Sequence, residues 1–483
     1  MLTQITTGGQ NRLYIGGEWV PASDGEQFPV LDPSTGEVIT EVASASAADG
    51  LTAVGVAYEA APEWAAAAPR ERGEILRRAF EIMTARADEI ATLIVLEMGK
   101  AFSEARAEAV YAAEFFRWFS EEAVRNLGTL GIAPGGDKRI ISVHQPIGVS
   151  VLITPWNFPA AMATRKIGPA FAAGCSVILK PASDTPLTAL ALAQILEEAG
   201  APAGTVSVIP SRRSSEVGEA MLTDPRVRAL SFTGSTSVGR RLLEVTARHI
   251  VRSSMELGGN APFVVFDDAD IEAAVAGAMI AKMRNGGQSC IAANRMLVHE
   301  AVADEFSAQF SAAMASVSTG PGLEAGVELG PMINQSAQDE MRELVDVSTG
   351  AGSSVATGGV APARPGFFFE PTVLTDVGLD DPILDREIFG PLAPVIRFET
   401  EEQALALANN TEHGLAAYVY TSNLTRGMRV AEAIEAGMVG INRGLISDPA
   451  APFGGVKESG LGREGGHHGM FEFLETKYIA ADW

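Results

Sequence analysis

The chain has two cysteines, and Cys290 is the one placed to react. It ends the segment RNGGQSC (284–290), whose two glycines let a ligand approach the backbone closely. A cysteine attacks carbon as its thiolate, so this role requires a lowered pKa or a neighbouring base. Cys175, in FAAGCSVIL, fits the commoner role of a small buried side chain. The sequence therefore indicates Cys290 as the candidate nucleophile, with simple packing as the alternative.

Glu256 is the candidate general base. It stands in MELGGN, an apolar and glycine-rich setting for a carboxylate. Burial of an unpaired carboxylate raises its pKa, and a base that works near pH 7 needs a raised pKa. A solvated glutamate on an edge strand is the alternative.

Two further segments carry polar groups at the ends of expected strands. Asn157, in TPWNFP, could donate its side-chain amide to an oxyanion, or it could simply form a turn between prolines. Gly234 and Ser235, in FTGSTS, stand between an expected strand and an expected helix. The first N–H groups of a helix favour an anion such as a cofactor pyrophosphate, although an ordinary strand-to-helix turn has the same pattern.

Alternating strands and helices must position these residues. The hydrophobic pattern predicts strands at 148–154, 176–180, 205–209 and 228–232, and helices at 160–173, 186–199, 215–222 and 236–248. This alternation predicts an α/β fold with a parallel, doubly wound sheet, in which ligands bind at the carboxyl ends of the strands. A second alternating region runs from about 261 to 450. Apolar spacing also predicts one helix over 73–98 that ends at Gly99, and a hairpin over 126–145.

Composition excludes several classes of protein. The 483 residues include 36 Lys and Arg against 60 Asp and Glu, a net charge of −24, which disfavours nucleic-acid or anionic membrane surfaces. Two cysteines exclude a disulfide scaffold, and the six histidines show no metal-binding spacing, so we expect no metal. We expect neither a signal peptide nor a membrane-spanning helix, and a cytoplasmic location.

Seven segments together carry a resemblance that none carries alone. They occur in the order TPWNFP, LKPAS, FTGSTS, MELGGN, NGGQSC, EIFGP and PFGGVKESGLGREGG. This series resembles the aldehyde dehydrogenase superfamily over essentially the whole chain. The last segment, preceded by VGINRGLIS, is most similar to the succinate-semialdehyde dehydrogenase branch.

The resemblance implies covalent catalysis. Cys290 would attack the aldehyde carbon, and the Asn157 amide together with the Cys290 N–H would hold the oxyanion. After hydride transfer to a nicotinamide, Glu256 would activate water to hydrolyse the thioester. Covalent catalysis of this kind divides one difficult oxidation into two easier steps.

The resemblance also implies a set of cofactor-binding residues. Lys180 and Glu387 would bind the riboses, Phe389 would lie beside the nicotinamide, and Ser235 would contact the pyrophosphate. The other matching positions are Thr154, Pro155, Trp156, Gly234 and Leu257. Relatives that prefer NAD often have a glutamate where this chain has Ser183, and a carboxylate there would repel a 2′-phosphate. We therefore expect NADP to be preferred, with NAD as a usable alternative.

Arg165, Arg284 and Ser447 match the residues that anchor the far carboxylate of succinate semialdehyde in that branch. A structural salt bridge is the alternative role for Arg284. Relatives often have a glutamate at the position of Arg443, which leaves glutarate semialdehyde, another oxo acid or an aromatic aldehyde as alternative substrates. Some relatives also have a second cysteine two residues after the nucleophile. Ala292 stands there, so we expect no internal redox switch.

Two other functions compete with a hydrolytic dehydrogenase. A CoA-acylating relative would generally lack the base, which Glu256 argues against. Loss of the nucleophile would indicate a non-catalytic protein on the same fold, whereas Cys290, Glu256 and Asn157 are all present.

The resemblance implies three structural parts and a homodimer or homotetramer. A Rossmann-type cofactor domain would comprise 1–125 and 145–255, and an α/β catalytic domain would comprise 256–455. A small β oligomerisation flap with the C-terminal tail would comprise 126–144 and 456–483. Sheet edges of neighbouring subunits would pair at that flap.

Overall fold

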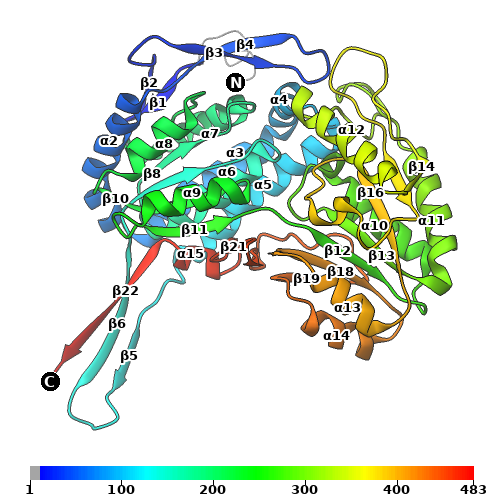
Figure 1. The fold of residues 1–483 in the computed structure, drawn as a ribbon. Coiled ribbons are helices and arrows are strands. Elements are labelled where there is room, and N and C mark those ends of the chain that lie inside the picture. Colours follow the sequence, from blue (N-terminus) through cyan, green and yellow to red (C-terminus); the bar gives the residue numbers. More distant parts are fainter. Residues whose placement is uncertain (1–10, 483) are drawn as a thin grey trace.

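The computed structural model describes residues 11–482, and the larger of its sheets has eight strands in the order β2-β1-β9-β8-β7-β10-β11-β21 (Figure 1). Strands β9, β8, β7, β10 and β11 run parallel, whereas β1 and β21 pair antiparallel with β9 and β11. The strands are β1 (Leu13–Ile15), β2 (Glu18–Val20), β7 (Val149–Ile153), β8 (Val177–Lys180), β9 (Val206–Val208), β10 (Val227–Thr233), β11 (Arg252–Glu256) and β21 (Gly460–Leu461). The predicted doubly wound sheet is therefore confirmed.

Alternate side chains of the central strands enter two separate cores, because a strand places successive residues on opposite faces. Val177 and Leu179 of β8 pack with α6 and α7, whereas Ile178 packs with α2 and α8. The helices of this half are α2 (Ala47–Ala66), α3 (Pro69–Ala85), α4 (Ala87–Met98), α5 (Phe102–Glu122), α6 (Pro159–Ala173), α7 (Pro186–Glu198), α8 (Ser214–Leu222) and α9 (Thr236–Thr246). Both faces of the sheet are thus covered by helices.

The single helix predicted over 73–98 is wrong, because two helices, α3 and α4, occupy this stretch. Arg86 separates them with φ −110° and ψ 22°, outside the helical region. Met83 and Ile90 pack into one core on either side of the break, so the apolar spacing alone does not reveal it. Gly99 does end α4, in the left-handed conformation with φ 91°.

A second sheet of seven strands lies in the other half of the described chain, in the order β14-β15-β16-β13-β12-β18-β19. Its strands are β12 (Ala261–Val265), β13 (Ala293–His299), β14 (Ser354–Thr357), β15 (Thr372–Thr375), β16 (Leu392–Phe398), β18 (Ala416–Tyr420) and β19 (Met438–Ile441). It is covered by α10 (Ile271–Met283), α11 (Glu300–Ala315), α12 (Gln335–Gly350), α13 (Glu401–Asn409) and α14 (Leu424–Ala433), with short 3-10 turns η1 (Arg284–Gly287) and η2 (Pro382–Asp385). The chain passes from the first sheet to the second between β11 and β12, next to the proposed domain boundary at residue 256.

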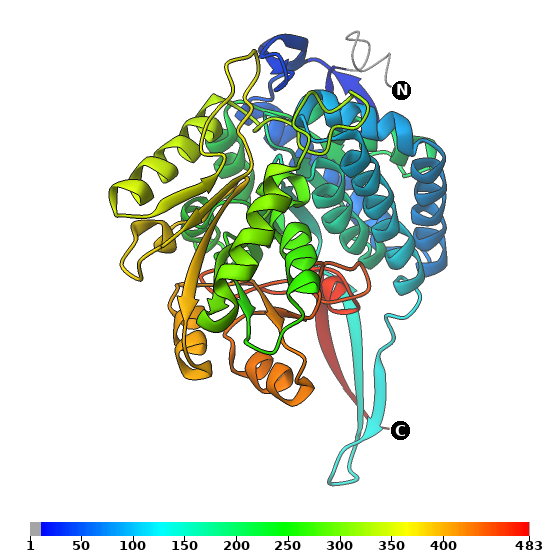
Figure 2. The same ribbon diagram turned by 90° about the vertical axis from the view of Figure 1, so that its right-hand side faces the viewer.

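A long hairpin projects from the body of the molecule (Figure 2). It consists of β5 (Thr129–Ile132) and β6 (Arg139–Pro146), and β22 (Leu474–Ala481) pairs with β6. Of the segment 456–483 assigned to the flap, only β22 joins it: β21 extends the eight-stranded sheet, and β20 (Val456–Lys457) pairs with β17 (His413–Gly414). The remaining elements are β3 (Gln27–Leu31), β4 (Val38–Ala43) and α15 (His468–Phe471). No helix within residues 11–482 is long and apolar enough to cross a membrane.

Candidate active site

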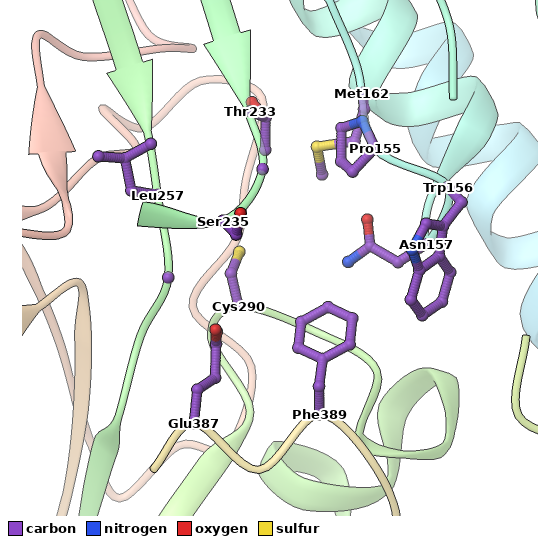
Figure 3. Close-up of a pocket in the computed structure, with 12 residues that line it drawn as sticks. Pro155, Trp156, Asn157, Met162, Thr233, Ser235, Leu257, Cys290, Glu387 and Phe389 are labelled. Atoms are coloured by element: carbon purple, nitrogen blue, oxygen red, sulfur yellow. The ribbon is translucent and has the colours of Figure 1, made fainter. Parts of the chain in front are cut away.

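A cavity of about 200 Å³ lies where loops of the two halves meet (Figure 3). The first half contributes the loops that follow β7, β10 and β11, and the second half contributes the segments around Cys290 and Glu387. The lining residues are Pro155, Trp156, Asn157, Met162, Thr233, Gly234, Ser235, Leu257, Gly258, Cys290, Glu387 and Phe389. The fold thus gathers predicted residues from five separate segments at the carboxyl edge of the larger sheet.

Hydrogen bonds fix Asn157 on both its backbone and its side chain. Its carbonyl oxygen accepts from Lys100 Nζ at 2.7 Å and from Asn285 Nδ2 at 2.9 Å. Its own Nδ2 donates to the carbonyl of Gln288 at 3.0 Å. That bond uses one of the two N–H groups of the amide, and the amide points toward Cys290 (Figure 3). The second N–H is left to stabilise an oxyanion.

The loop before Cys290 is held in a conformation that its sequence suits. Asn285 has φ 57° and ψ 32°, a left-handed conformation that asparagine tolerates, and Gly286 and Gly287 follow with positive φ. The Asn285 Nδ2 bridges the carbonyls of Asn157 and Gln288, with 2.9 Å to each. Within the described chain, the N–H of Cys290 has no protein acceptor. It is therefore free to act as the second oxyanion donor.

Cys290 is half-buried, and its thiol is held protonated near neutral pH. Burial and the carboxylate of Glu387 raise the pKa of Cys290 to about 12. The thiol therefore needs a base before it can attack. Cys175 is fully buried, and its Sγ donates to the Phe473 carbonyl at 3.4 Å, as expected of a packing residue.

Glu256 ends β11 between β10 and β21 and is 1% exposed, so the alternative of a solvated edge glutamate is wrong. Both of its carboxylate oxygens are buried without a hydrogen-bond partner. Burial, together with the nearby charge of Glu464, raises the pKa of Glu256 well above its ordinary value. A raised pKa means that the ionised carboxylate binds a proton more strongly than an ordinary glutamate does, so Glu256 in its ionised form is the stronger base.

Glu464 is a buried carboxylate near Glu256 that the sequence did not single out. It forms a buried ion pair with Lys166 at 2.5 Å and lies 3.6 Å from Arg165. Lys166 also donates to Ser231 at 2.9 Å. In the sequence Glu464 resembles Glu256, because it is also a carboxylate among glycines, here in LGREGG.

The cavity beside Cys290 has features that fit a dinucleotide. Ser235 begins α9 without a side-chain capping bond, and the buried hydroxyls of Thr233 and Thr236 beside it have no partner. Open helix N–H groups and unpaired hydroxyls suit a pyrophosphate. Glu387 accepts from the Gly259 N–H at 2.9 Å, and burial raises the pKa of Glu387 to about 7.

The predicted cofactor residues fall into two groups. Those that line the cavity are Pro155, Trp156, Gly234, Ser235, Leu257, Glu387 and Phe389. Thr154, Lys180 and Ser183 lie outside it. Lys180 is buried at the end of β8, where its Nζ donates to the Pro181 carbonyl at 3.1 Å and burial lowers its pKa to about 8. Ser183 lines a separate hollow together with Asp184 and Arg212.

A second, smaller pocket lies on the other side of Cys290 and contains all three predicted carboxylate anchors. It is lined by Tyr111, Phe158, Met162, Arg165, Arg284, Ser289, Cys290, Ile291, Ser447 and Phe453. Arg284 lies over the rings of Phe158 and Tyr111, and no carboxylate of the described chain is within 4.0 Å of it. The salt-bridge role considered for Arg284 is therefore wrong.

Neither of the two positions that differ from the relatives lines this pocket. The exposed Arg443 donates to the Leu445 carbonyl of its own loop at 2.6 Å and does not line the pocket. Ala292 is buried two residues beyond the nucleophile. Tyr111, by contrast, lies in the pocket, and its position on a long amphipathic helix offered no local signal.

Alkylation should reveal the protonation of Cys290. We expect a neutral reagent, iodoacetamide, to modify Cys290 slowly at pH 7, and the rate to rise about tenfold per pH unit up to pH 10, because thiolate is the reactive form and the pKa lies near 12. Peptide mass analysis measures the rate, and Cys290→Ala reports the background from Cys175. A rate that levels off below pH 9 would contradict the raised pKa.

Comparison with known proteins agrees with this geometry. The model of the aldehyde dehydrogenase family matches residues 19–479. A succinate-semialdehyde dehydrogenase of Paenarthrobacter nicotinovorans is 54% identical, covering 92% of this chain and 98% of its own. A glutarate-semialdehyde dehydrogenase of Pseudomonas aeruginosa is 49% identical, covering 97% of each. The crystal structure of an Escherichia coli NADP-dependent enzyme superposes with a TM-score of 0.97 at 47% identity, covering 98% of each chain. The chain belongs to the aldehyde dehydrogenase family.

Proposed function

We propose that this aldehyde dehydrogenase oxidises succinate semialdehyde to the dicarboxylic acid, with NADP as its preferred cofactor and NAD as a second. One observation carries the proposal: Cys290 lines both the cavity beside Glu387 and the pocket that holds Arg165, Arg284 and Ser447. A nucleophile at this junction can meet a cofactor on one side and an acidic aldehyde on the other. The relative that is 54% identical is a succinate-semialdehyde dehydrogenase, which supports the same substrate.

The pocket favours an aldehyde with a negative far end. Arg284 has no carboxylate partner within 4.0 Å in the described chain, so its charge is available to a ligand. The charge of Arg165 is offset only in part by Glu464, which also pairs with Lys166. Guanidinium groups bind carboxylates with charge-assisted hydrogen bonds. The aromatic side chains of Phe158 and Phe453 line the rest of the pocket and suit methylene groups.

The cofactor-side residues fit a nicotinamide dinucleotide. Ser235 and the start of α9 would hold its pyrophosphate, Glu387 and Lys180 its riboses, and Phe389 would flank its ring. When bound, the nicotinamide accepts the hydride of the substrate carbon, which leaves a thioester on Cys290. Trp156 packs edge-on against Phe389, with 5.4 Å between ring centroids, and so fixes the wall of this cavity.

The side chains of this protein perform the remaining steps. The Cys290 thiol gives up its proton to solvent, and its sulfur bonds to the aldehyde carbon as the carbonyl π bond opens onto the oxygen. The free N–H of the Asn157 amide and the N–H of Cys290 hold the resulting oxyanion. Glu256 then takes a proton from water, whose oxygen bonds to the thioester carbon, and the thiolate leaves as the acid forms.

A longer semialdehyde is the second candidate substrate. The relative that is 49% identical is a glutarate-semialdehyde dehydrogenase, which differs in its substrate by one methylene. One methylene changes discrimination in an apolar pocket by only about 10- to 200-fold. A CoA-acylating reaction is disfavoured because Glu256 is present, buried and unpaired.

We also propose a cytoplasmic homodimer or homotetramer. The projecting hairpin and β22 expose the apolar side chains of Leu130, Ile132, Tyr478 and Ile479, which supports pairing with another subunit. Both cysteines are free, which is usual for a reducing compartment.

Substrate preference tests the proposal directly. We expect kcat/KM for succinate semialdehyde to exceed that for butanal, which has the same chain length without the carboxylate, by about 100-fold or more, because two charge-assisted contacts are lost. Arg284→Gln should remove most of this preference. Arg443→Gln is the matched control and should leave it unchanged. Equal kcat/KM for the two aldehydes in the wild type would contradict the proposal.

Cofactor preference rests on Ser183. A serine there leaves room for a 2′-phosphate, and Arg212 lines the same hollow, although Asp184 and Glu97 line it too. We expect a higher kcat/KM with NADP than with NAD, and a reversal in Ser183→Glu because the carboxylate repels the phosphate. Ser214→Glu, at an exposed position on α8, is the control for added charge. A kcat/KM of the wild type that is tenfold higher with NAD than with NADP would contradict this assignment.

The two catalytic steps can be separated by substitution. Glu256→Gln should release one equivalent of reduced cofactor in a burst and then stall, since hydride transfer precedes hydrolysis. Cys290→Ala should bind the cofactor without turnover, whereas Cys175→Ala should remain active. Stopped-flow absorbance of the reduced nicotinamide measures all three. Steady turnover at the wild-type rate in Glu256→Gln would remove Glu256 as the base.

A further inference from the structure

Tyr111 contacts all three proposed carboxylate anchors. It lies on α5, and its hydroxyl oxygen accepts a hydrogen bond from Arg165 Nη2 at 2.6 Å. The same hydroxyl lies 2.5 Å from Ser447 Oγ. The guanidinium of Arg284 lies over the Tyr111 ring, 5.5 Å from its centroid. Tyr111 therefore contacts residues from three segments of the chain. Arg165 comes from α6, Arg284 from the loop before Cys290, and Ser447 from the loop after β19.

The hydroxyls of Tyr111 and Ser447 together have one hydrogen more than their mutual hydrogen bond uses. Tyr111 and Ser447 each carry one hydroxyl hydrogen, and their mutual bond uses one of them, whichever group donates. Both oxygens also accept from Arg165, at 2.6 and 3.2 Å. In the described part of the chain no acceptor is found for the second hydroxyl hydrogen. One O–H group is thus left to donate to a ligand.

The surrounding groups are donors as well. The buried Nε of Arg165 has no hydrogen-bond partner, and Arg284 has no carboxylate within 4.0 Å among residues 11–482. Guanidinium groups donate and never accept. The donors of Arg165 and Arg284 and the spare hydroxyl hydrogen are together complementary to a group that only accepts, and an ionised carboxylate is such a group.

We propose that the hydroxyl of Tyr111 determines specificity for an acidic aldehyde, by supplying, jointly with Ser447, the O–H donor to the far carboxylate of the substrate. This inference rests on the proposed function and adds to it a residue outside the Arg165, Arg284 and Ser447 set. Tyr111 is a specificity-determining residue: it contacts the end of the substrate remote from the carbon that reacts.

Removal of one oxygen tests the proposal. Tyr111→Phe keeps the ring that packs edge-on against Phe115 at 5.0 Å, so the fold should be retained. We expect kcat/KM for succinate semialdehyde to fall about 10- to 100-fold, mainly through KM, because a hydrogen bond to a charged group is lost. For butanal we expect a change of about twofold or less, since it makes no such bond. Tyr58→Phe, an exposed tyrosine on α2, is the matched control and should change neither value.

A double variant tests whether the two hydroxyls act together. If Tyr111 and Ser447 supply one shared donor, the variant that combines Tyr111→Phe with Ser447→Ala should lose less kcat/KM for succinate semialdehyde than the product of the two single losses. If the loss in kcat/KM of the double variant equals the product of the two single losses, the two hydroxyls do not share one donor.

The outcomes separate this inference from the proposed function. A wild type that oxidises butanal as well as the semialdehyde contradicts the proposed function, and the inference falls with it. A selective wild type whose Tyr111→Phe variant keeps its full preference overturns the inference alone. Equal losses for both aldehydes overturn it as well, since they show that the hydroxyl only supports the fold.

Discussion

The active site depends on a few hydrogen bonds that join the two halves of the molecule. The carbonyls of Asn157 and Gln288 are bridged by the side chain of Asn285, and the Asn157 amide returns a bond to Gln288. These bonds hold the Asn157 amide, the proposed oxyanion donor, at a fixed position relative to the segment that ends at Cys290. Donors that are oriented before the reaction cost no reorganisation during it. Loss of this link would leave Cys290 in place without the amide that its intermediate needs.

Burial is the second constraint, and it acts on each ionisable group of the site. It raises the pKa of Cys290, Glu256 and Glu387, because the charged form of each group loses its hydration. The buried pair of Lys100 and Glu108 has further hydrogen-bond partners, since Lys100 donates to the Asn157 carbonyl and Glu108 accepts from the start of α6. Arg284 has no carboxylate within 4.0 Å among residues 11–482, in a protein of net charge −24. The attraction of an acidic substrate therefore comes from the arginines of the pocket and not from the net charge of the protein.

Much of the fold could be predicted because strand–helix alternation is a local pattern. The strands from β7 to β10 and their helices lie within a few residues of their expected ranges. The break at Arg86 could not be predicted, since one apolar stripe continues across it. For the site, Cys290, Glu256 and Asn157 lie in short distinctive segments. Tyr111 could not be found in this way, because its role arises from contacts with residues 54 and 336 positions away.

We expect the reaction to pass through an acyl group on Cys290. Acid quenching of Glu256→Gln after one turnover with succinate semialdehyde and NADP, followed by peptide mass analysis, locates that group. The account predicts a thioester on the peptide that contains Cys290, in an amount equal to the reduced cofactor formed, with Cys175 unmodified. Reduced cofactor formed in one equivalent while Cys290 stays unmodified, or an acyl group on Cys175, would contradict it.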